Sequence, residues 1–255
     1  MNLGILSSGS NGNALVVEES GRCIFFDGGL SGREHLSRLN ISGFTAPSPL
    51  GIFLSHEHCD HSRGVGVLAR KWGIPVFSSP GTFTGAGLDR QRLPAGAECY
   101  ENGDSVDLGP FRVTTFRTSH DAADPSGFVV EAGGVRLGIA TDMGEAGPLT
   151  THMLSGCNGL VLEFNHDLEM LWDGPYPWPL KQRVSSGLGH LSNEDASSLL
   201  EKLSHPALST CVLAHLSQEN NTPELALESA RRVSEDRFAL IVGSRYQALP
   251  MIQVV

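Results

Sequence analysis

The sequence has few of the features that mark an exported or membrane-bound chain. Residues 1–6 lack a basic segment followed by an apolar one, and no apolar run is long enough to cross a bilayer. There are five cysteines, an odd number, and none belongs to a CxxC pair. A zinc ribbon therefore has no support, and reduced thiols in the cytosol fit this pattern. We predict a cytoplasmic protein that has no membrane partner.

Positive charge is also scarce. The chain has 18 Lys and Arg against 28 Asp and Glu, a net charge of −10, and it contains no basic run. Such a chain lacks the broad positive field that attracts nucleic acids to many of their binding proteins. A phosphate substrate would have to be attracted locally, and divalent cations in a carboxylate-rich pocket supply such local charge.

No linker or low-complexity tract divides the chain, although its 30 glycines and 14 prolines predict many turns. A composition that is 40% hydrophobic over 255 residues is sufficient for a large core. We therefore predict a single domain over residues 1–255.

Short apolar segments bounded by turn residues predict strands in two blocks. The strands are expected at residues 3–6, 14–17, 23–26, 52–54 and near Val76, and then at 106–108, 112–117, 127–131, 135–140, 160–162 and 211–214. Gly133-Gly134 predicts a two-residue hairpin turn. Helices are expected at 65–72, beyond Asp142, after a capping box at Ser192, and after Thr222. Two blocks of strands, each with helices, predict an α/β fold, a four-layer αββα sandwich.

One short segment gathers side chains that bind metals. His56, His58, Asp60 and His61 directly follow the predicted strand 52–54. This mixture of neutral imidazole and hard carboxylate suits a divalent transition metal. A single such histidine fits an ordinary surface loop, but the four together favour a metal site. Cys59, inside the same segment, would have to point opposite to its neighbours, so we expect no ligand role for it.

The order HxHxDH in this segment resembles the signature of the metallo-β-lactamase superfamily. The resemblance implies that His56 and His58 bind one metal, and that Asp60 and His61 bind a second. Asp60 is also counted among the catalytic residues, because it belongs to the centre at which the reaction is expected.

Three later ligands are implied by the same resemblance, each at the end of a predicted strand. His120 would complete the first metal, Asp142 would bridge both metals, and His215 would complete the second. Each residue alone also fits an ordinary polar cap, but their order matches the family. Two divalent metal ions are therefore expected, with Zn or Mn first and Fe, Ni or Co also compatible. A bridging hydroxide is the expected nucleophile, since two-metal sites lower the pKa of water from about 15.7 to about 7.

His190 lies outside this ligand set, in the segment GHLSN. The segment resembles the histidine motif of the phosphodiesterase branch of the superfamily, which includes the tRNase Z proteins and in which such a histidine faces the scissile phosphate. Glu163, at the end of the predicted strand 160–162, matches its carboxylate partner. The resemblance implies that Glu163 orients His190 and favours its protonated form, so that His190 protonates the leaving alkoxide. A structural histidine before a helix is the alternative.

Some polar residues have structural explanations that compete with a functional one. Asp27 ends the predicted strand 23–26 and matches an early aspartate of the family, which orients the metal-binding loop. A simple turn-capping role explains Asp27 as well. His35, His152 and His205 are predicted to be surface or hydrogen-bonded structural histidines, with no chemistry assigned to them.

The substrate-binding candidates follow the predicted strand 160–162. His166 is a candidate for lining the pocket, because it lies only three residues after Glu163. Lys181 and Arg183 lie near Trp178, and aromatic and cationic side chains of this kind hold a nucleobase and a phosphate. Solvated surface residues are the alternative for these cations.

The resemblance extends over essentially the whole chain. The segments SSGSNGN, SHEHCDH, TDMG, EFNHD, GHLSN and AHLSQENNTPE resemble the YycJ/WalJ-like branch of the superfamily. The resemblance implies a metal-dependent phosphodiesterase, of the type that degrades DNA as a 5′-to-3′ exonuclease. Nucleic acid, and DNA first, is therefore the expected partner as substrate. The net charge argues against strong, processive binding, and the sequence names no protein partner.

Three alternatives to a nuclease stay open. The chain could be a small-molecule esterase or thioesterase resembling glyoxalase II, a phosphodiesterase of cyclic nucleotides or other small molecules, or a catalytically silent scaffold that retains its metals. The pair Glu163 and His190 favours phosphodiester cleavage, because an alkoxide is a poor leaving group and needs a proton.

Overall fold

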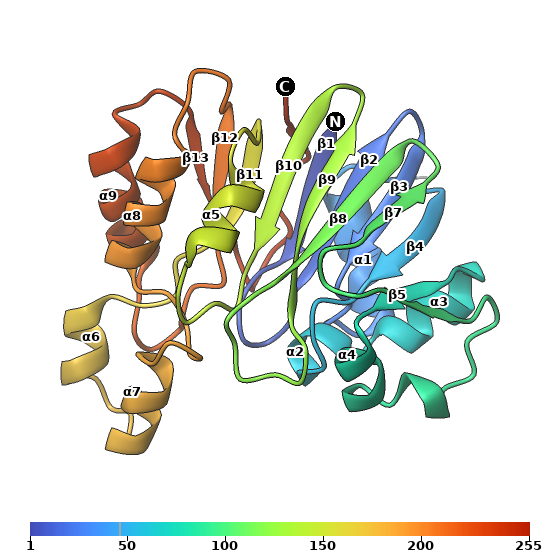
Figure 1. The fold of residues 1–255 in the computed structure, drawn as a ribbon, viewed down its shortest axis with the longest axis horizontal. Coiled ribbons are helices and arrows are strands. Elements are labelled where there is room, and N and C mark those ends of the chain that lie inside the picture. Colours follow the sequence, from blue (N-terminus) through green and yellow to red (C-terminus); the bar gives the residue numbers. More distant parts are fainter. Residues whose placement is uncertain (46) are drawn as a thin grey trace.

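Two β-sheets face each other, and helices cover the outer face of each (Figure 1). The computed structural model describes residues 1–45 and 47–255. In this part of the chain the first sheet contains, in spatial order, β14 (Ile252–Gln253), β1 (Asn2–Ser7), β2 (Ala14–Glu19), β3 (Arg22–Phe26), β4 (Pro49–Phe53), β5 (Val76–Ser78) and β6 (Ala97–Cys99). The second contains β13 (Ala239–Val242), β12 (Thr210–Ala214), β11 (Gly159–Glu163), β10 (Val135–Ala140), β9 (Ser126–Ala132), β8 (Phe111–Arg117) and β7 (Ser105–Leu108).

Each sheet is antiparallel in one part and parallel in the other. Strands β1, β2 and β3 pair antiparallel, and β3, β4, β5 and β6 continue in parallel. In the second sheet β7 to β10 pair antiparallel, and β10 to β13 pair in parallel. Parallel neighbours need long crossover connections, which here carry the helices. Gly133 and Gly134, with φ of 59° and 79°, form the predicted tight turn between β9 and β10.

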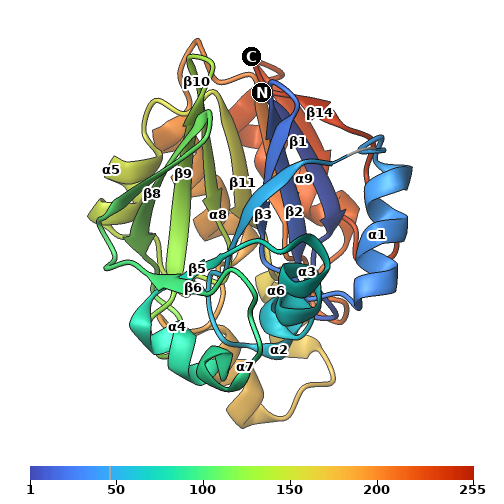
Figure 2. The ribbon, with the colours of Figure 1, turned by 90° about the vertical axis from the view of Figure 1, so that its right-hand side faces the viewer.

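The helices fall into two outer layers and one end group. The first sheet is covered by α1 (Gly32–Ile41) and α3 (Val65–Trp72), and the second by α5 (Pro148–Leu154), α8 (Asn193–Leu203) and α9 (Pro223–Ser234). The end group comprises α2 (Cys59–Ser62), α4 (Pro80–Gly85), α6 (Leu168–Asp173) and α7 (Trp178–Val184), and a short 3-10 turn covers Leu88–Arg90. Figures 1 and 2 show this end group opposite the two chain termini. Among the described residues no helix combines the length and the apolar character needed to span a membrane.

The alternation of side chains along the strands explains the four layers. Phe26, Phe53 and Phe128 point between the sheets, and the rings of Phe26 and Phe128 lie 5.0 Å apart. The neighbouring residue Phe25 points to the other face, toward α1 and α3. Because successive strand residues point to opposite faces, each apolar strand serves two cores. The predicted αββα sandwich is confirmed.

The predicted elements are present, with ends shifted by up to three residues. The Ser192 hydroxyl accepts a hydrogen bond from the Asp195 backbone amide at the start of α8, and the Thr222 hydroxyl accepts one from Leu225 at the start of α9. These contacts are the caps expected from the sequence. The sequence did not predict α1, α2, α4, α6, α7, β6, β13 and β14.

Candidate metal centre

The candidate residues reach one end of the sandwich because each follows or ends a strand. Asp27 follows β3, and the segment from His56 to His61 follows β4. His120, Asp142 and His215 follow β8, β10 and β12, and Glu163 is the last residue of β11. The carboxyl ends of parallel strands meet at one edge of a sheet, and the two facing sheets bring both edges together.

The backbone is strained at three of these strand ends. Asp27, Asp142 and His215 have φ of 60°, 57° and 57°, in the left-handed region that non-glycine residues rarely adopt. Each such residue costs on the order of 1–3 kcal/mol and persists only where its surroundings hold it. Three of the six non-glycine residues with positive φ among the described residues are thus predicted to form or support the metal centre.

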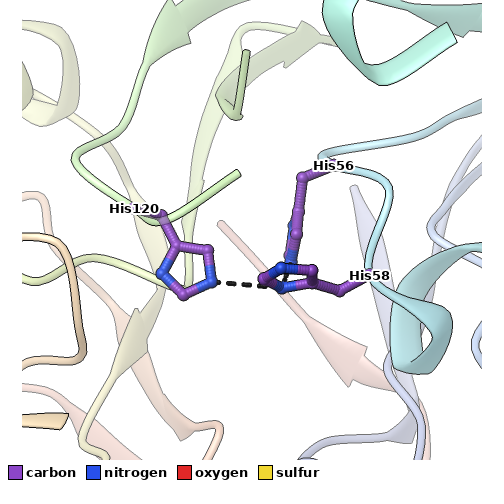
Figure 3. Close-up of side chains that lie close together, drawn as sticks. All are labelled: His56, His58 and His120. Carbon is purple, nitrogen blue, oxygen red and sulfur yellow. Dashed lines mark hydrogen bonds between the residues drawn. The ribbon is translucent and has the colours of Figure 1, made fainter. Parts of the chain in front are cut away.

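Three imidazoles form the first group of donors. The distance from His56 Nε2 to His58 Nδ1 is 3.1 Å, and that from His120 Nε2 to His58 Nδ1 is 3.3 Å. Figure 3 shows His120 approaching from one side and His56 and His58 from the other. Donors of a tetrahedral zinc site, each about 2.0–2.1 Å from the ion, lie roughly 3.3 Å from one another. The three nitrogens are therefore spaced as ligands of one cation.

A second group lies beside the first, with Asp142 between them. Asp60 Oδ2 lies 3.5 Å from His61 Nε2 and 3.8 Å from His215 Nε2. Asp142 Oδ2 lies 3.3 Å from His61 Nε2, while its Oδ1 lies 3.5 Å from His215 Nε2 and 3.8 Å from His120 Nε2. The structure thus brings together all seven predicted ligands, and Asp142 faces both groups.

The outward nitrogens of the early histidines are fixed by Asp27 and Ser55. His61 Nδ1 donates to Asp27 Oδ2 at 2.7 Å, and His56 Nδ1 donates to Ser55 Oγ at 3.0 Å. Ser55 in turn donates to Asp27 through its amide, at 2.8 Å, and its hydroxyl, at 2.9 Å. With Nδ1 bonded in this way, each ring presents its Nε2 lone pair to the centre. This geometry agrees with the orienting role for Asp27 rather than with a simple turn cap.

The later histidines are oriented from the second sheet. His120 Nδ1 donates to the Gly189 carbonyl at 3.0 Å, and His215 Nδ1 donates to Glu163 Oε1 at 3.0 Å. The His215 backbone amide donates to Ser8 Oγ at 2.7 Å. The Nε2 atoms of both rings are therefore the ones that face the centre.

Two buried atoms of this cluster indicate that it is built for a cation. Among the described residues, Asp142 Oδ2 and His215 Nε2 are buried and have no hydrogen-bond partner. Burial alone would raise the pKa of Asp142, but His215 and His61 hold it well below its usual value, so the carboxylate is ionised. A buried, ionised and incompletely paired carboxylate is costly unless a positive charge is bound to it. Together with the imidazole and carboxylate donors, this identifies a divalent metal site.

The pKa values of two histidines point the same way. Burial lowers the pKa of His61, but Asp27 and Asp142 raise it well above its usual value. Burial lowers the pKa of His215 too, and Asp142, Asp60 and Glu163 together raise it to about 10. Without a cation the carboxylates therefore keep His61 and His215 protonated, and a bound cation takes the place of those protons.

Glu163 and His190 form the predicted pair. His190 Nδ1 donates to Glu163 Oε1 at 2.8 Å, and Glu163 is fully buried. Its Oε2 accepts the backbone amides of Met143, at 2.7 Å, and Leu191, at 3.3 Å. Burial would raise the pKa of Glu163, but the charge and hydrogen bond of His190, with a further hydrogen bond from His215, lower it to about 2. Glu163 is therefore anionic and is held by four hydrogen bonds, two from backbone amides and one from each of His190 and His215.

The His190 ring covers the two groups of donors. Its centroid lies 5.1 Å from that of His120 and 5.2 Å from that of His215. The side chain is 21% exposed and lines a pocket of about 270 Å³ together with Asp121, Asn165 and other residues. Because Nδ1 is bonded to Glu163, Nε2 is the atom left to meet a substrate in that pocket.

The substrate-binding candidates differ in their positions. Arg183 lines the pocket and forms a salt bridge with Asp121. Lys181 is only 8% exposed, and its ammonium donates to the Trp172 carbonyl at the end of α6. His166 is 1% exposed, is not among the residues lining the pocket, and has a pKa lowered to about 4 by burial. The structure thus brings Arg183, but neither Lys181 nor His166, to the pocket.

Several contact residues were not singled out from the sequence. The Asn13 amide nitrogen lies 2.8 Å from His61 Nε2 and 3.3 Å from Asp60 Oδ2. Asn165 Nδ2 donates to the His215 carbonyl at 2.9 Å. The sequence signal for Asn13 was the Ser and Asn content of the loop between β1 and β2, but a tight turn alone explained that content.

Comparison with known proteins supports both the fold and the chemistry. A family model described as the Beta-lactamase superfamily domain matches residues 22–216. The exodeoxyribonuclease YycJ of Bacillus anthracis is 34% identical over 238 residues, which cover 93% of this chain and 90% of that protein. The exodeoxyribonuclease WalJ of Streptococcus pneumoniae is 34% identical over 227 residues, covering 87% of this chain and 84% of that protein.

Solved structures with low sequence identity share the fold. The metallo-β-lactamase fold protein YhfI from Bacillus subtilis superposes with a TM-score of 0.76 at 14% identity, covering 97% of this chain and 98% of that chain. The short form of human tRNase Z superposes with a TM-score of 0.68 at 17% identity, covering 100% of both chains.

Proposed function

The chain belongs to the β-lactamase superfamily and is a metallo-hydrolase, and on this premise we propose that it hydrolyses phosphodiester bonds in nucleic acid as a 5′-to-3′ exonuclease acting on DNA. The predicted resemblance to the YycJ/WalJ-like branch is confirmed. The names of these relatives support DNA as the substrate, and their similarity covers most of this chain.

The observation that carries the proposal is the contact between Glu163 and His190 beside the donor cluster. The alkoxide that leaves a phosphodiester is a strong base, so its departure is slow without a proton donor. A thioester releases a thiolate, which needs no such donor. A buried carboxylate that holds an imidazole 2.8 Å away, at the edge of the metal site, is therefore explained by phosphodiester cleavage.

In this proposal each residue of the metal site has a defined role. When bound, two cations, Zn or Mn first, would supply a hydroxide nucleophile at neutral pH and positive charge against the phosphate. His56, His58 and His120 would hold one of them, Asp60, His61 and His215 would hold the other, and Asp142 would bridge both. Asp27 and Ser55 keep the two early imidazoles in the required tautomer.

The proton path follows from the hydrogen bonds of His190. The anion of Glu163 stabilises an imidazolium by accepting a hydrogen bond from its Nδ1–H group, and the Nε2 proton is then available to the leaving oxygen in the pocket. Because Glu163 also accepts two backbone amides and His215, it cannot rotate away as the proton moves. Arg183 forms a salt bridge with Asp121 and lines the same pocket, where it would bind a substrate phosphate.

The test compares three substrates with Mn and with Zn. We expect hydrolysis of bis(p-nitrophenyl) phosphate and of 5′-labelled single-stranded DNA, and no comparable turnover of a thioester. Turnover of the thioester alone would favour an enzyme resembling glyoxalase II. No turnover of any substrate would favour a scaffold that retains its metals.

The direction of digestion is tested with a labelled linear strand, and the need for a free end is tested with a circular strand. A 5′-labelled oligonucleotide should release its label as a mononucleotide from the earliest time points. A circular single strand of matched composition is the control and should persist. Cleavage of the circle would contradict the exonuclease mode while leaving phosphodiester hydrolysis intact.

A further inference from the structure

A second pocket lies next to the one beside His190. It has a volume of about 360 Å³ and is lined by Ser8, Ser217, Gln218, Arg245 and Tyr246, among others. Ser217 also lines the pocket that contains His190. The two pockets are therefore neighbours that share Ser217 in their linings, and we call the second one the Tyr246 pocket.

The Tyr246 pocket is connected to the metal centre by hydrogen bonds of Ser8, in the loop between β1 and β2. Ser8 Oγ accepts the backbone amide of His215 at 2.7 Å, and the Ser8 amide donates to the Ser244 carbonyl at 3.0 Å. Two hydrogen bonds thus connect a candidate ligand to the segment that carries Arg245 and Tyr246. The position of this segment relative to the centre is fixed by the fold.

Arg245 presents a positioned positive charge in this pocket. Its Nη1 donates to Gln218 Oε1 at 3.0 Å, and its Nη2 donates to the Leu216 carbonyl at 2.5 Å. Both partners are neutral, so these contacts orient the guanidinium without neutralising it. A guanidinium has further N–H groups beyond those two, and its planar fork matches phosphate oxygens.

Tyr246 places an aromatic ring beside that charge. Its side chain is 73% exposed, and the guanidinium carbon of Arg245 lies 5.8 Å from the ring centroid. Proteins that bind single strands stack bases on aromatic rings, and a neighbouring Arg adds to the contact. A positioned cation and an exposed ring in one pocket are the two elements that hold a single nucleotide unit.

We propose that the Tyr246 pocket binds the nucleotide adjoining the scissile phosphate, with Arg245 holding a phosphate and Tyr246 stacking on a base. This inference rests on the proposed nuclease function and adds the path of the strand, from the pocket of His190 across Ser217. It also explains how a chain with a net charge of −10 holds a polyanion, since the positive charge needed is local.

An alternative path for the DNA strand would run over the exposed tryptophans of α6 and α7. Trp172 and Trp178 are 40% and 61% exposed, and their rings lie 5.5 Å apart. Glu169 and Asp173 lie on α6 with Trp172. Arg183 on α7 offsets these carboxylates in part, but neither tryptophan is among the residues that line the pocket of His190. The Tyr246 pocket shares Ser217 with that pocket and is therefore favoured.

The experiment compares an oligonucleotide with a small reporter. For each variant, kcat/KM is measured on a 5′-labelled single-stranded oligonucleotide and on bis(p-nitrophenyl) phosphate, and the ratio of the two values is taken. Tyr246→Ala should lower this ratio about tenfold, because the base loses the ring on which it stacks. Tyr246→Phe keeps the ring and should keep the ratio.

The charge is tested by salt dependence. Binding of a phosphorothioate single strand is measured by fluorescence anisotropy over a range of salt concentrations. Arg245→Gln should reduce the slope of log K against log salt by about 0.7, the value for one phosphate contact on a single strand.

The outcomes separate this inference from the proposed function. If the wild-type protein degrades the oligonucleotide and Tyr246→Ala leaves the ratio unchanged, the inference is overturned while the nuclease function stands. A lower ratio in Trp178→Ala, with no change in Tyr246→Ala, would place the DNA strand along α7 and would also overturn the inference. If the wild-type protein hydrolyses the reporter but not the oligonucleotide, the nuclease function itself fails.

Discussion

Two fully buried histidines of this molecule have opposite surroundings. His61, in the metal centre, is bonded to Asp27 and faces Asp142, and these carboxylates outweigh burial and raise its pKa well above the usual value. His35, on α1, packs against Phe25 and Trp72 at ring distances of 5.1 and 6.4 Å, and burial lowers its pKa to about 4. Burial is therefore common to both, and the neighbouring carboxylates distinguish the candidate metal ligand.

The environment of His35 corrects a prediction. The sequence predicted a surface or hydrogen-bonded structural histidine, and that prediction was wrong for His35. The residue is 0% exposed, and among the described residues neither of its ring nitrogens has a hydrogen-bond partner. The reason is tertiary packing, because β3 and α3 place aromatic rings against one face of α1.

The largest effect is expected from removing the carboxylate between the two groups of donors. Asp142→Ala should lower phosphodiesterase activity by at least about a thousandfold, because the charge that joins both groups contributes several kcal/mol. Activity is measured on bis(p-nitrophenyl) phosphate. Asp107→Asn, which alters a carboxylate 71% exposed on β7, is the matched control and should keep full activity. Equal rates in Asp142→Ala and the control would show that carboxylates do not define the centre.

The next effect separates proton donation from metal binding. His190→Ala should retain its metals and cleave the oligonucleotide about 10²–10⁴-fold more slowly, the usual range for a general acid. The loss should be much smaller on bis(p-nitrophenyl) phosphate, because p-nitrophenolate leaves readily without a proton. Equal losses on both substrates would contradict the role of His190 as an acid.

A smaller effect, on the free energy of unfolding, is expected at His35. The folded state holds the pKa of His35 at about 4, below its ordinary 6.5, so the unfolded chain takes up the proton first as the pH falls. The stability that depends on neutral His35 is thus present above pH 6.5 and is lost below it, by about 2 kcal/mol between pH 7 and pH 5. Urea unfolding of the metal-free protein should show this loss, and His35→Leu should lack it. Parallel pH profiles for the two proteins would refute the assignment.

The smallest effect is expected at Cys59, within the metal-binding segment itself. Its thiol is exposed, and it belongs to none of the donor groups among the described residues. Cys59→Ser should therefore leave metal content and turnover within about twofold of wild type, as for surface substitutions away from key contacts. A large loss of metal would contradict this expectation, because it would show that Cys59 contributes to metal binding although its thiol is exposed.

The sequence predicted the centre better than its surroundings. The donor residues and the pair Glu163 and His190 were found because they match the motifs of the family that the sequence resembles, in the same order along the chain. The tautomers were not predictable, because Ser55 and Gly189 bind the outward nitrogens of His56 and His120 only after the loops have folded.

Elements that depend on distant partners were missed for a similar reason. β14 has two residues and pairs with β1, so Ile252 and Leu3 meet only in the folded chain. α6 and α7 are six and seven residues long, too short for a clear helical pattern of apolar residues. Lys181 looked like a phosphate ligand in the sequence, but the fold turns its ammonium to the Trp172 carbonyl.

The metal content of the purified chain tests the central claim most directly. After dialysis against Mn or Zn, elemental mass spectrometry should find two cations per wild-type chain, and His120→Ala and His215→Ala should each retain about one. Exposed His152 offers a matched control, since His152→Ala should retain both. A wild-type chain without bound cations, or ligand variants that bind as many as wild type, would contradict the account.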